Sequence, residues 1–296
     1  MTASDVEIFP CDLCGGDDPA EIEVARFYTG GQRVYVCRNC GLIYARERRS
    51  EQAIADTWSH SIFPDKGAPL AYTAGIPWVI GRLTVAAEFL RQNIGLAGKS
   101  VAEIGAGEGV FLNIVRRDPY GAAVYGIEPS PSNCRSLTSQ GIPVFEGTIG
   151  RYLTSPEAAT RQFDVVVMLW TLECCRSPRQ MLESAHRMLK PGGHVLVGTG
   201  SRILVPFKKP LQMFFSRSPI DTHPVNFSFN TLRGMLATTG FDMSHVNRFI
   251  DNDLLIMMGT KRETHDRPSW DKDDWRVVTA FFDRWHKETQ DHYADL

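Results

Sequence analysis

Four cysteines near the N-terminus have the types and spacing of metal ligands. Cys11 and Cys14 form one C-x-x-C-G motif, and Cys37 and Cys40 form a second. Two residues between the thiolates allow one turn to present both sulfurs to a tetrahedral ion, and four thiolates leave no open coordination position. We therefore predict a structural Zn²⁺ site with these four cysteines as its ligands. A redox-active pair is the alternative, but two matched motifs flanked by glycines favour the metal.

A glycine-rich segment is the second feature that could do chemistry. Residues 103–109 read EIGAGEG, after the short apolar run 99–104 and before the helical spacing of 110–115. Between a strand and a helix, such a turn lets a nucleotide ligand lie against the backbone. The dinucleotide fingerprint G-x-G-x-x-G would need glycine where Val110 stands, and this disfavours a nicotinamide-dependent dehydrogenase.

Two carboxylates accompany the glycine-rich turn. Glu128 ends the second predicted strand, where a carboxylate can accept hydrogen bonds from the ribose hydroxyls of an adenosine ligand. Glu103 heads the turn and suits a cationic ligand, and S-adenosylmethionine carries both a sulfonium and an ammonium group. Together the turn and the two acids favour an adenosine ligand that carries positive charge, as S-adenosylmethionine does.

The elements that must position these residues alternate between short buried runs and helical spacing. The predicted strands are 99–104, 123–127, a short one at 144, 163–169, 194–198 and 254–259, and the predicted helices are 76–90, 110–115, 132–138, 178–189, 227–240 and 269–286. This alternation indicates parallel βαβ units in a doubly wound α/β fold. Residues 202–226 contain four prolines and form a long insertion of the kind that often acts as a lid.

Length and composition set the domain organisation and the compartment. The 296 residues, 43% hydrophobic and 22% charged, suit one large α/β domain with a small appendage. We expect a zinc-binding module at 1–50, a helical entry or lid segment at 51–98, a donor-binding domain at 99–262 with the insertion 202–226, and a helical tail at 263–296. The formal charge of -2 gives no global reason to expect a polyanionic partner. No signal peptide or membrane span is evident, and the seven cysteines suit a reducing compartment, so we expect a cytoplasmic protein.

Four motifs in order, EIGAGEG, GIEPS, FDVVVMLWTLE and LKPGG, resemble those of the class I S-adenosylmethionine-dependent methyltransferases. With the cysteine-rich head running into CGLIYARERRSEQ, the chain is similar to the branch that methylates sugars and related metabolites. The resemblance covers most of residues 8–260 and implies a Rossmann-like, mostly parallel seven-stranded sheet with a small N-terminal zinc-binding module. The donor contacts that it implies are Glu103, Gly105, Ala106 and Gly107 near the methionine part, Glu128 and Pro129 near the ribose, Thr148 and Ile149 near the adenine, and Leu169 and Trp170 beside the donor.

The same resemblance leaves the catalytic base open. Related chains often carry H-V-L-E-H after the fourth strand, but here Trp170 and Cys174 stand at the two histidine positions. Glu173, which is kept, is a candidate base, and the alternative is a carboxylate that orients the loop or caps the next helix. His223 matches a family position shortly before Phe-Ser and is a candidate for base or acceptor contact. The alternative is a loop histidine that hydrogen-bonds the backbone.

Residues outside these motifs are weaker candidates. The segment from Trp58 to Trp78 could fold over the donor, with Tyr72 or Arg82 reaching its carboxylate, although core packing of an entry helix is the stronger interpretation. Lys208, Lys209 and Arg217 could attract a phosphate, as a nucleotide-linked sugar requires, whereas simple solvation is the alternative.

The function predicted from these features is methyl transfer from S-adenosylmethionine to a small-molecule acceptor, at a hydroxyl or carbon of a sugar, nucleotide sugar or natural product. One alternative is an RNA base methyltransferase with a zinc module, which the acidic residues and the lack of Lys or Arg in 1–25 disfavour. The other is a non-catalytic donor-binding protein, suggested by the missing histidines. We expect no nucleic-acid or membrane partner, and the aromatic tail helix packs either on the core or on a second subunit of a homodimer.

Overall fold

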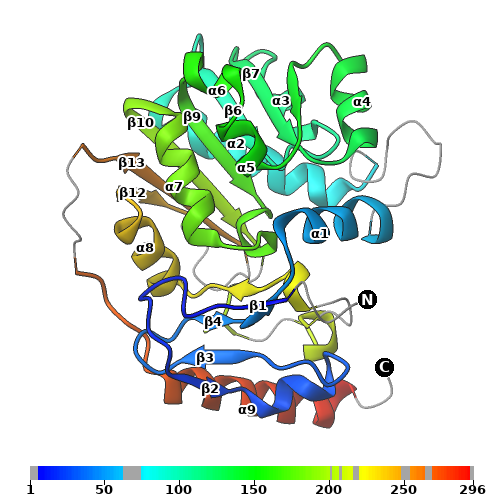
Figure 1. Ribbon diagram of the computed structural model, residues 1–296, viewed down its shortest axis with the longest axis vertical. Coiled ribbons are helices and arrows are strands. Elements are labelled where there is room, and N and C mark those ends of the chain that lie inside the picture. The colour runs from blue at the N-terminus through cyan, green and yellow to red at the C-terminus, as the bar shows by residue number, and fades with distance from the viewer. Residues whose placement is uncertain are drawn as a thin grey trace.

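The computed structural model describes residues 6–62, 75–200, 202–206, 209–215, 220–247, 254–263 and 269–293. Figure 1 shows a large sheet with its helices in the upper part of the view and a smaller layer of N-terminal strands over the helix α9 in the lower part. Within the described ranges, no helix combines the length and hydropathy needed to cross a membrane.

The large sheet has seven strands in the order β12-β13-β10-β9-β6-β7-β8. All neighbouring pairs are parallel except those of β13, which is antiparallel to both β10 and β12. The strands are β6 (Ser100–Ile104), β7 (Ala123–Glu128), β8 (Val144–Glu146), β9 (Phe163–Leu169), β10 (Leu189–Thr199), β12 (Phe241–Val246) and β13 (Leu255–Lys261). The predicted fold class, a Rossmann-like and mostly parallel seven-stranded sheet, is confirmed.

Helices connect and cover these strands. They are α2 (Pro77–Ile94), α3 (Val110–Val115), α4 (Pro131–Ser139), α5 (Ile149–Leu153), α6 (Pro156–Thr160), α7 (Pro178–Met188) and α8 (Phe229–Thr238). Side chains cap the starts of two helices that matter for the site: Ser177 caps α7 ahead of Pro178, and Ser228 forms a capping box with Thr231 at α8, where the sequence predicted the N-cap. Because Ser177 fixes where α7 begins, it also fixes where the loop between β9 and α7 ends.

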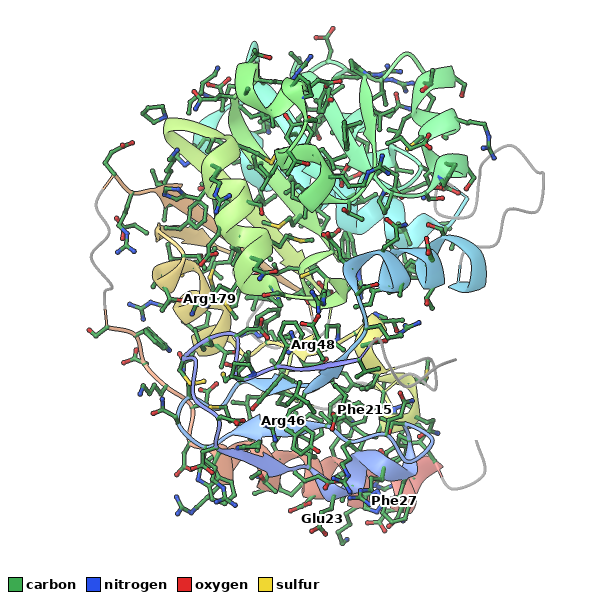
Figure 2. The ribbon with its side chains drawn as sticks, viewed as in Figure 1. Glu23, Phe27, Arg46, Arg48, Arg179 and Phe215 are labelled. Carbon is green, nitrogen blue, oxygen red and sulfur yellow. The ribbon has the colours of Figure 1, made fainter. Side chains whose placement is uncertain are left out.

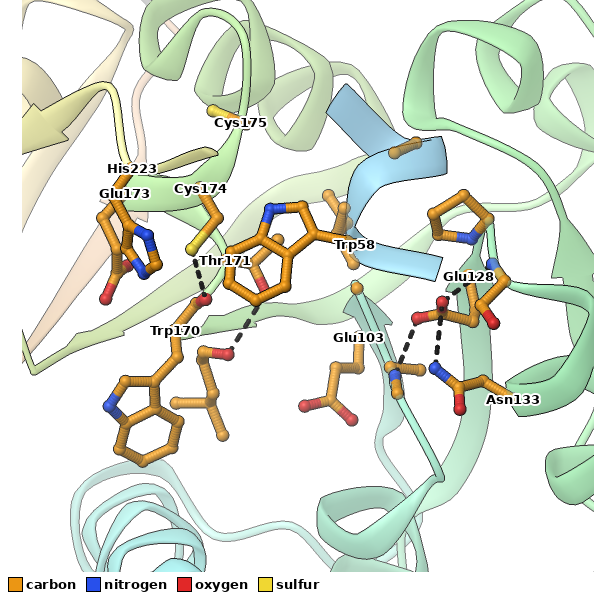
Figure 3. Close-up of a pocket in the computed structure, with 18 of the residues that line it drawn as sticks. Trp58, Glu103, Glu128, Asn133, Trp170, Thr171, Glu173, Cys174, Cys175 and His223 are labelled. Atoms are coloured by element: carbon orange, nitrogen blue, oxygen red, sulfur yellow. Dashed lines mark hydrogen bonds between the residues drawn. The ribbon is translucent and has the colours of Figure 1, made fainter. Parts of the chain in front are cut away.

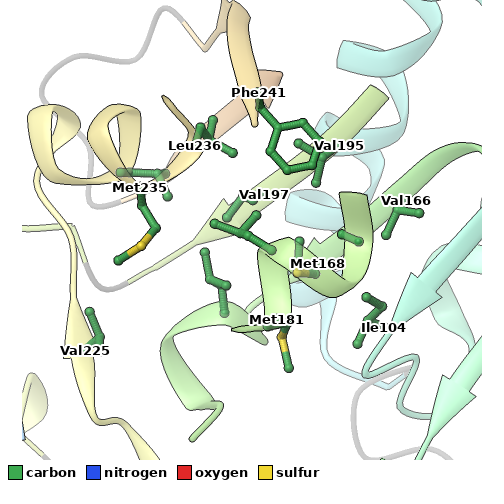
Figure 4. Close-up of a cluster of buried hydrophobic side chains, with 14 of the residues drawn as sticks. Ile104, Val166, Met168, Met181, Val195, Val197, Val225, Met235, Leu236 and Phe241 are labelled. Atoms are coloured by element: carbon green, nitrogen blue, oxygen red, sulfur yellow. The ribbon is translucent and has the colours of Figure 1, made fainter. Parts of the chain in front are cut away.

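One side of the large sheet packs against α7 and α8. Figure 4 shows Met168 of β9 and Val195 and Val197 of β10 beside Met181 of α7 and Met235 of α8. All five side chains are buried. This packing holds the carboxyl ends of the central strands in a rigid frame, on which loop residues can be positioned.

The N-terminal residues form a second, smaller sheet. Its four antiparallel strands follow the order β11-β4-β3-β2, and their bounds are β2 (Pro19–Glu21), β3 (Tyr35–Cys37), β4 (Ile43–Tyr44) and β11 (Val225–Asn226). A separate pair joins β1 (Glu7–Ile8) to β5 (Glu47–Arg48), and the 3-10 helix η1 (Glu23–Phe27) follows β2. Since β11 lies in the predicted insertion, between β10 and α8, the insertion completes the N-terminal sheet.

The tail helix α9 (Trp275–Tyr293) packs on this small sheet, against β3 and η1. The insertion contributes two 3-10 helices, η4 (Leu211–Met213) and η5 (Ile220–Thr222). Buried residues from all three segments make one hydrophobic cluster, which includes Ile22, Val36 and Ile43 from the N-terminus, Leu211 and Phe215 from the insertion, and Val278, Phe282 and Trp285 from α9. Phe215 is labelled in the lower part of the molecule in Figure 2. The N-terminus, the insertion and the tail therefore share one core.

A short helical segment links the two parts. Ser50 caps α1 (Glu51–Asp56) by accepting a hydrogen bond from the backbone of Ala53, and α1 runs directly into the π-helix η2 (Thr57–Ile62). Figure 1 shows α1 between the large sheet and the N-terminal strands. Isolated π-helical turns are rare and often occur at functional sites.

Candidate functional site

A cavity of about 890 Å³ lies where the large sheet, the segment 51–59 and the insertion meet (Figure 3). Each residue that the sequence predicted as a donor contact lines it: Glu103, Gly105, Ala106, Gly107, Glu128, Pro129, Thr148, Ile149, Leu169 and Trp170. Both candidate catalytic residues, Glu173 and His223, line the same cavity. Ligands of open α/β sheets bind at the carboxyl ends of the strands, which is where β6, β7 and β9 deliver these residues.

The glycine turn after β6 leaves space on the cavity side. Gly105 has φ +74°, and a Cβ there would lie 2.6 Å from Oγ1 of Thr171, so the turn and the loop after β9 are in close contact. Gly107 has φ +53°, and a Cβ there would have nothing within 4 Å. The positive φ favours glycine at both positions, but of the two only Gly107 has open space in front of it for a ligand.

Glu128 is held by the turn that it faces. Its Oε2 accepts a hydrogen bond from the backbone N–H of Gly107 at 2.8 Å, and its Oε1 accepts from Ser130 N at 2.9 Å and Asn133 Nδ2 at 3.3 Å. Burial raises the pKa of this carboxyl, and the donated hydrogen bonds act against that shift. A carboxylate offers about four lone-pair sites, so Glu128 can still accept from a ligand hydroxyl.

Glu103 is a buried carboxyl, 3% exposed, in the same wall. Its Oε2 has no hydrogen-bond partner among the described residues. Burial, followed by the proximity of Glu128, raises its pKa well above the ordinary value. A buried acid in this position is stabilised by a cation in the cavity, so the site fits a positively charged ligand.

Glu173 lies in the 3-10 helix η3 (Leu172–Cys174) that follows β9. The side chain is 1% exposed; its Oε1 accepts a hydrogen bond from Oγ1 of Thr199 at 2.8 Å, and its Oε2 has no partner in the described part of the chain. Burial raises the pKa of Glu173 to about 7. A carboxyl that titrates near neutral pH is suited to general base chemistry.

His223 follows η5 and reaches the cavity from the insertion side. Its Nδ1 is buried without a hydrogen-bond partner in the described ranges, and its ring meets the Trp58 ring edge-on at a centroid distance of 5.2 Å. Burial and the nearby charge of Lys209 lower its pKa to about 4. The imidazole is therefore neutral at neutral pH.

Other cavity-lining residues were not assigned individually from the sequence, namely Ser130, Asn133, Thr171, Phe214 and Phe215. Trp58, at the start of the segment expected to fold over the donor, also lines the cavity. Arg82 and Lys209 also line it, whereas Tyr72, Lys208 and Arg217 lie outside the described residues. Helical periodicity does not reveal which loops come together at the cavity. The local signal for these residues was the aromatic content of 58–78 and 202–226.

The backbone of Trp170 has φ +56°, an uncommon value for a non-glycine residue and one that often marks functional sites.

The four cysteines of the two motifs come together away from this cavity. Their sulfurs all lie within 4.8 Å of one another, with Cys11 to Cys40 and Cys14 to Cys37 at 3.5 Å. The backbone N–H of Gly16 donates to Sγ of Cys14 at 3.4 Å. Tetrahedral Zn²⁺ with Zn–S bonds of about 2.3 Å needs sulfurs roughly 3.8 Å apart, so this donor set fits a closed zinc site.

Comparison with known proteins agrees with the fold. A family model described as "Methyltransferase domain" matches residues 82–246, more than half of the chain. The chain is 30% identical over 117 residues to the ubiquinone biosynthesis O-methyltransferase of Pseudomonas paraeruginosa, and 31% identical over the same length to that of Pseudomonas aeruginosa. Each match covers 38% of this chain and 50% of the relative, so the chain spans about half the length of these curated relatives.

Two solved structures share the fold. The 1,6-didemethyltoxoflavin-N1-methyltransferase of Burkholderia thailandensis, solved with its namesake ligand and S-adenosylhomocysteine, aligns with a TM-score of 0.53 at 14% identity, over 75% of this chain and 96% of that chain. The magnesium protoporphyrin IX methyltransferase of Synechocystis PCC 6803, solved with bound S-adenosylhomocysteine, aligns with a TM-score of 0.50 at 13% identity, over 72% of this chain and 100% of that chain. At these identities the likeness concerns the fold.

Proposed function

Since the chain belongs to the class I S-adenosylmethionine-dependent methyltransferases, we propose that it transfers a methyl group from S-adenosylmethionine to a small-molecule acceptor. The observation that carries this proposal is a single cavity lined both by the predicted donor contacts and by two titratable candidates, Glu173 and His223.

Residues of the large sheet would hold the donor. Glu128 would accept hydrogen bonds from the ribose, Glu103 would face the positively charged methionine part, and Thr148 and Ile149 would flank the adenine. The donor supplies a methyl group on a sulfonium, which is electrophilic without help from the protein. The open room before Gly107 and the buried, unpartnered Oε2 of Glu103 support this assignment.

The remaining task of the protein is to align the acceptor and exclude water. Leu169 ends β9 and Trp170 follows it, and both line the cavity. The part of the cavity lined by Trp58, Glu173, Phe214 and His223 would be its acceptor side. Glu173 in its ionised form would take the proton from an acceptor hydroxyl or carbon, and His223 would contact the acceptor or take that role itself. Cys174 needs no part in this scheme, because methyl transfer requires no covalent intermediate on the protein.

The acceptor class that we propose is a sugar, a nucleotide-linked sugar or a natural product. Aromatic side chains of Trp58, Trp170 and Phe214 give flat surfaces on which a ring can lie, and Arg82 and Lys209 add positive charge that suits a phosphate-bearing acceptor. An RNA acceptor is less well supported, since arginines of the N-terminal module pair with its own acids: Arg26 with Glu21, Arg38 with Asp18 and Arg46 with Asp17.

We also propose that the four clustered cysteines hold a structural Zn²⁺. Cys11, Cys14, Cys37 and Cys40 would complete a tetrahedral thiolate site, which leaves no position for a substrate. The zinc would stabilise the N-terminal module and take no part in the transfer.

Two measurements test the proposed function. Calorimetry with S-adenosylmethionine and S-adenosylhomocysteine should detect binding of both, and Glu128→Ala should weaken both. Transfer of a labelled methyl group should then be detected with some members of a panel of sugars, nucleotide sugars and aromatic metabolites. Donor binding without transfer to any acceptor supports a non-catalytic protein instead, and RNA binding that weakens steeply with salt supports an RNA enzyme.

A further inference from the structure

Trp58 and His223 meet at the acceptor side of the cavity although they lie on elements far apart in the sequence. Trp58 belongs to η2 and His223 follows η5, and their rings contact edge-on with an interplanar angle of 65°. Figure 3 shows both side chains in the space in front of the loop that carries Glu173 and Cys174. The relative position of these two rings therefore shapes the surface that an acceptor would contact.

A single arginine contacts the elements that carry both rings. The backbone N–H and Nε of Arg49 donate to Oδ2 of Asp221 at 2.9 and 2.8 Å, and Nη2 donates to Oδ1 at 2.7 Å. Its Nη1 donates to Oγ1 of Thr57 at 2.9 Å. Asp221 lies in η5, just ahead of His223, and Thr57 directly precedes Trp58. The planar guanidinium thus fixes η5 and η2 relative to each other.

The pair is sheltered from water, which makes its geometry well defined. The side chains of Arg49 and Asp221 are 17% and 6% exposed. Asp221 raises the pKa of Arg49 through its hydrogen bonds, and the charge is kept. A bidentate pair that is largely buried restricts side-chain motion far more than an exposed pair does.

Other contacts hold the backbone of the insertion independently of Arg49. Ala45 N donates to the carbonyl of Pro224 at 2.7 Å, Ile220 N donates to Oε1 of Gln32 at 2.7 Å, and His223 N donates to the carbonyl of Ile220 at 3.1 Å. Loss of the guanidinium fork should therefore leave the chain folded, and its main effect should fall on the relative position of the Trp58 and His223 rings.

We infer that Arg49 is a positioning residue, which acts through Asp221 and Thr57. It holds the rings of His223 and Trp58 in a fixed relative position at the acceptor side of the cavity. This inference rests on the proposed function for its kinetic consequence. Arg49 does not line the cavity, so it acts on the acceptor through these two rings. The donor contacts lie on the large sheet and the loops that follow its strands, so donor binding should not depend on Arg49.

The variant that tests this inference is Arg49→Lys, which keeps the charge and removes the fork. Arg46→Lys is the matched control, because Arg46 pairs with Asp17 in the same module and does not line the cavity. Iodide quenching of Trp58 fluorescence, obtained as the difference from the same protein carrying Trp58→Phe, should increase in Arg49→Lys and not in Arg46→Lys. This readout requires no turnover, so it tests the positioning even if methyl transfer is never detected.

Kinetic measurements provide a second test of the inference. In Arg49→Lys, kcat/KM for the acceptor should fall roughly 10- to 100-fold, as expected for a small displacement of reacting groups, while the calorimetric affinity for the donor is unchanged. Asp221→Asn should behave in the same way, and combining Arg49→Lys with Trp58→Phe should add little to either single change. Unchanged Trp58 quenching in Arg49→Lys, an equal kinetic loss in Arg46→Lys, or a parallel loss of donor affinity would each overturn the inference.

Discussion

Asp12, which lies between two clustered cysteines, forms a fully buried ion pair with Arg48. Oδ2 of Asp12 lies 2.7 Å from Nη2 of Arg48, and the two side chains are 3% and 0% exposed. Oδ1 of Asp12 accepts from Oγ of Ser177 at 2.8 Å, and Nη1 of Arg48 donates to the carbonyl of Arg176 at 2.6 Å. Figure 2 shows Arg48 between the large sheet and the N-terminal strands. The cysteine cluster is thereby bonded to the loop after β9, where Glu173 lies.

Loss of Arg48 should destabilise the protein strongly. Arg48→Met leaves the carboxylate of Asp12 buried without its cation, and breaking a buried pair in this way typically costs about 3–5 kcal/mol. Denaturant unfolding followed by circular dichroism would measure the free energy of unfolding. Arg46→Met is the control, since its pair with Asp17 is partly exposed and should contribute less than about 1 kcal/mol. Equal losses in the two variants would contradict the importance of burial here.

The cysteine cluster should hold about one zinc ion per chain. Elemental analysis of the purified protein would measure this, and Cys14→Ser should remove most of the metal because it deletes one of four thiolates. Chelation should also lower the free energy of unfolding, since metal binding is coupled to folding of such modules. Cys134→Ser is a matched control, because Cys134 is a buried cysteine outside the cluster. Full zinc content in Cys14→Ser would rule out this ligand set.

The central part of the fold was predictable from local pattern. The apolar run of β9 and the helical spacing of α3 lie at the predicted residues, because a buried parallel strand and a short amphipathic helix leave strong signals. The strand β12 was not predicted. It lies at the sheet edge with several exposed positions, and its sequence FDMSHV lacks a continuous apolar run.

The N-terminal sheet and the helix α9 that packs on it depend on contacts that no local sequence pattern reveals. The two-residue strand β11 pairs with β4, and α9 packs on β3, although both partners lie far away in the sequence. For the same reason the donor contacts near Gly105 and Glu128 could be proposed from motifs, while the contact of Trp58 with His223 could not. It arises from the packing of the linking helix against the insertion.

The two glycines of the donor turn should respond differently to alanine. Gly107→Ala places a methyl group in open room, so it should weaken donor binding about tenfold or more with a stability loss of about 1–2 kcal/mol for the left-handed backbone. Gly105→Ala should destabilise the fold further, because its Cβ would lie 2.6 Å from Oγ1 of Thr171. Calorimetry and thermal unfolding would measure the two effects. Unaltered donor affinity in Gly107→Ala would place the donor elsewhere in the cavity.

Glu173 should make stability and turnover depend on pH in opposite directions. Burial raises its pKa from 4.5 to about 7, so the protonated form is favoured in the folded state. Its contribution to stability is therefore complete below about pH 4.5 and is lost as the pH rises through 7. Above pH 7, Glu173→Gln should have a higher free energy of unfolding than the wild-type protein, because glutamine carries no buried charge. Denaturant unfolding at pH 5 and pH 8 would show the difference.

The pH profile of turnover should distinguish Glu173 from His223 as the base. If ionised Glu173 takes the proton, kcat/KM for the acceptor rises up to about pH 7 and then levels off. Glu173→Gln then removes this rise and lowers kcat by about 10²- to 10⁴-fold, while His223→Asn keeps the shape of the profile. If His223 is the base, its pKa of about 4 predicts a level rate from weakly acidic pH upward, and the loss of rate appears in His223→Asn instead. In both cases donor affinity measured by calorimetry should change far less than turnover, because neither residue is one of the predicted donor contacts.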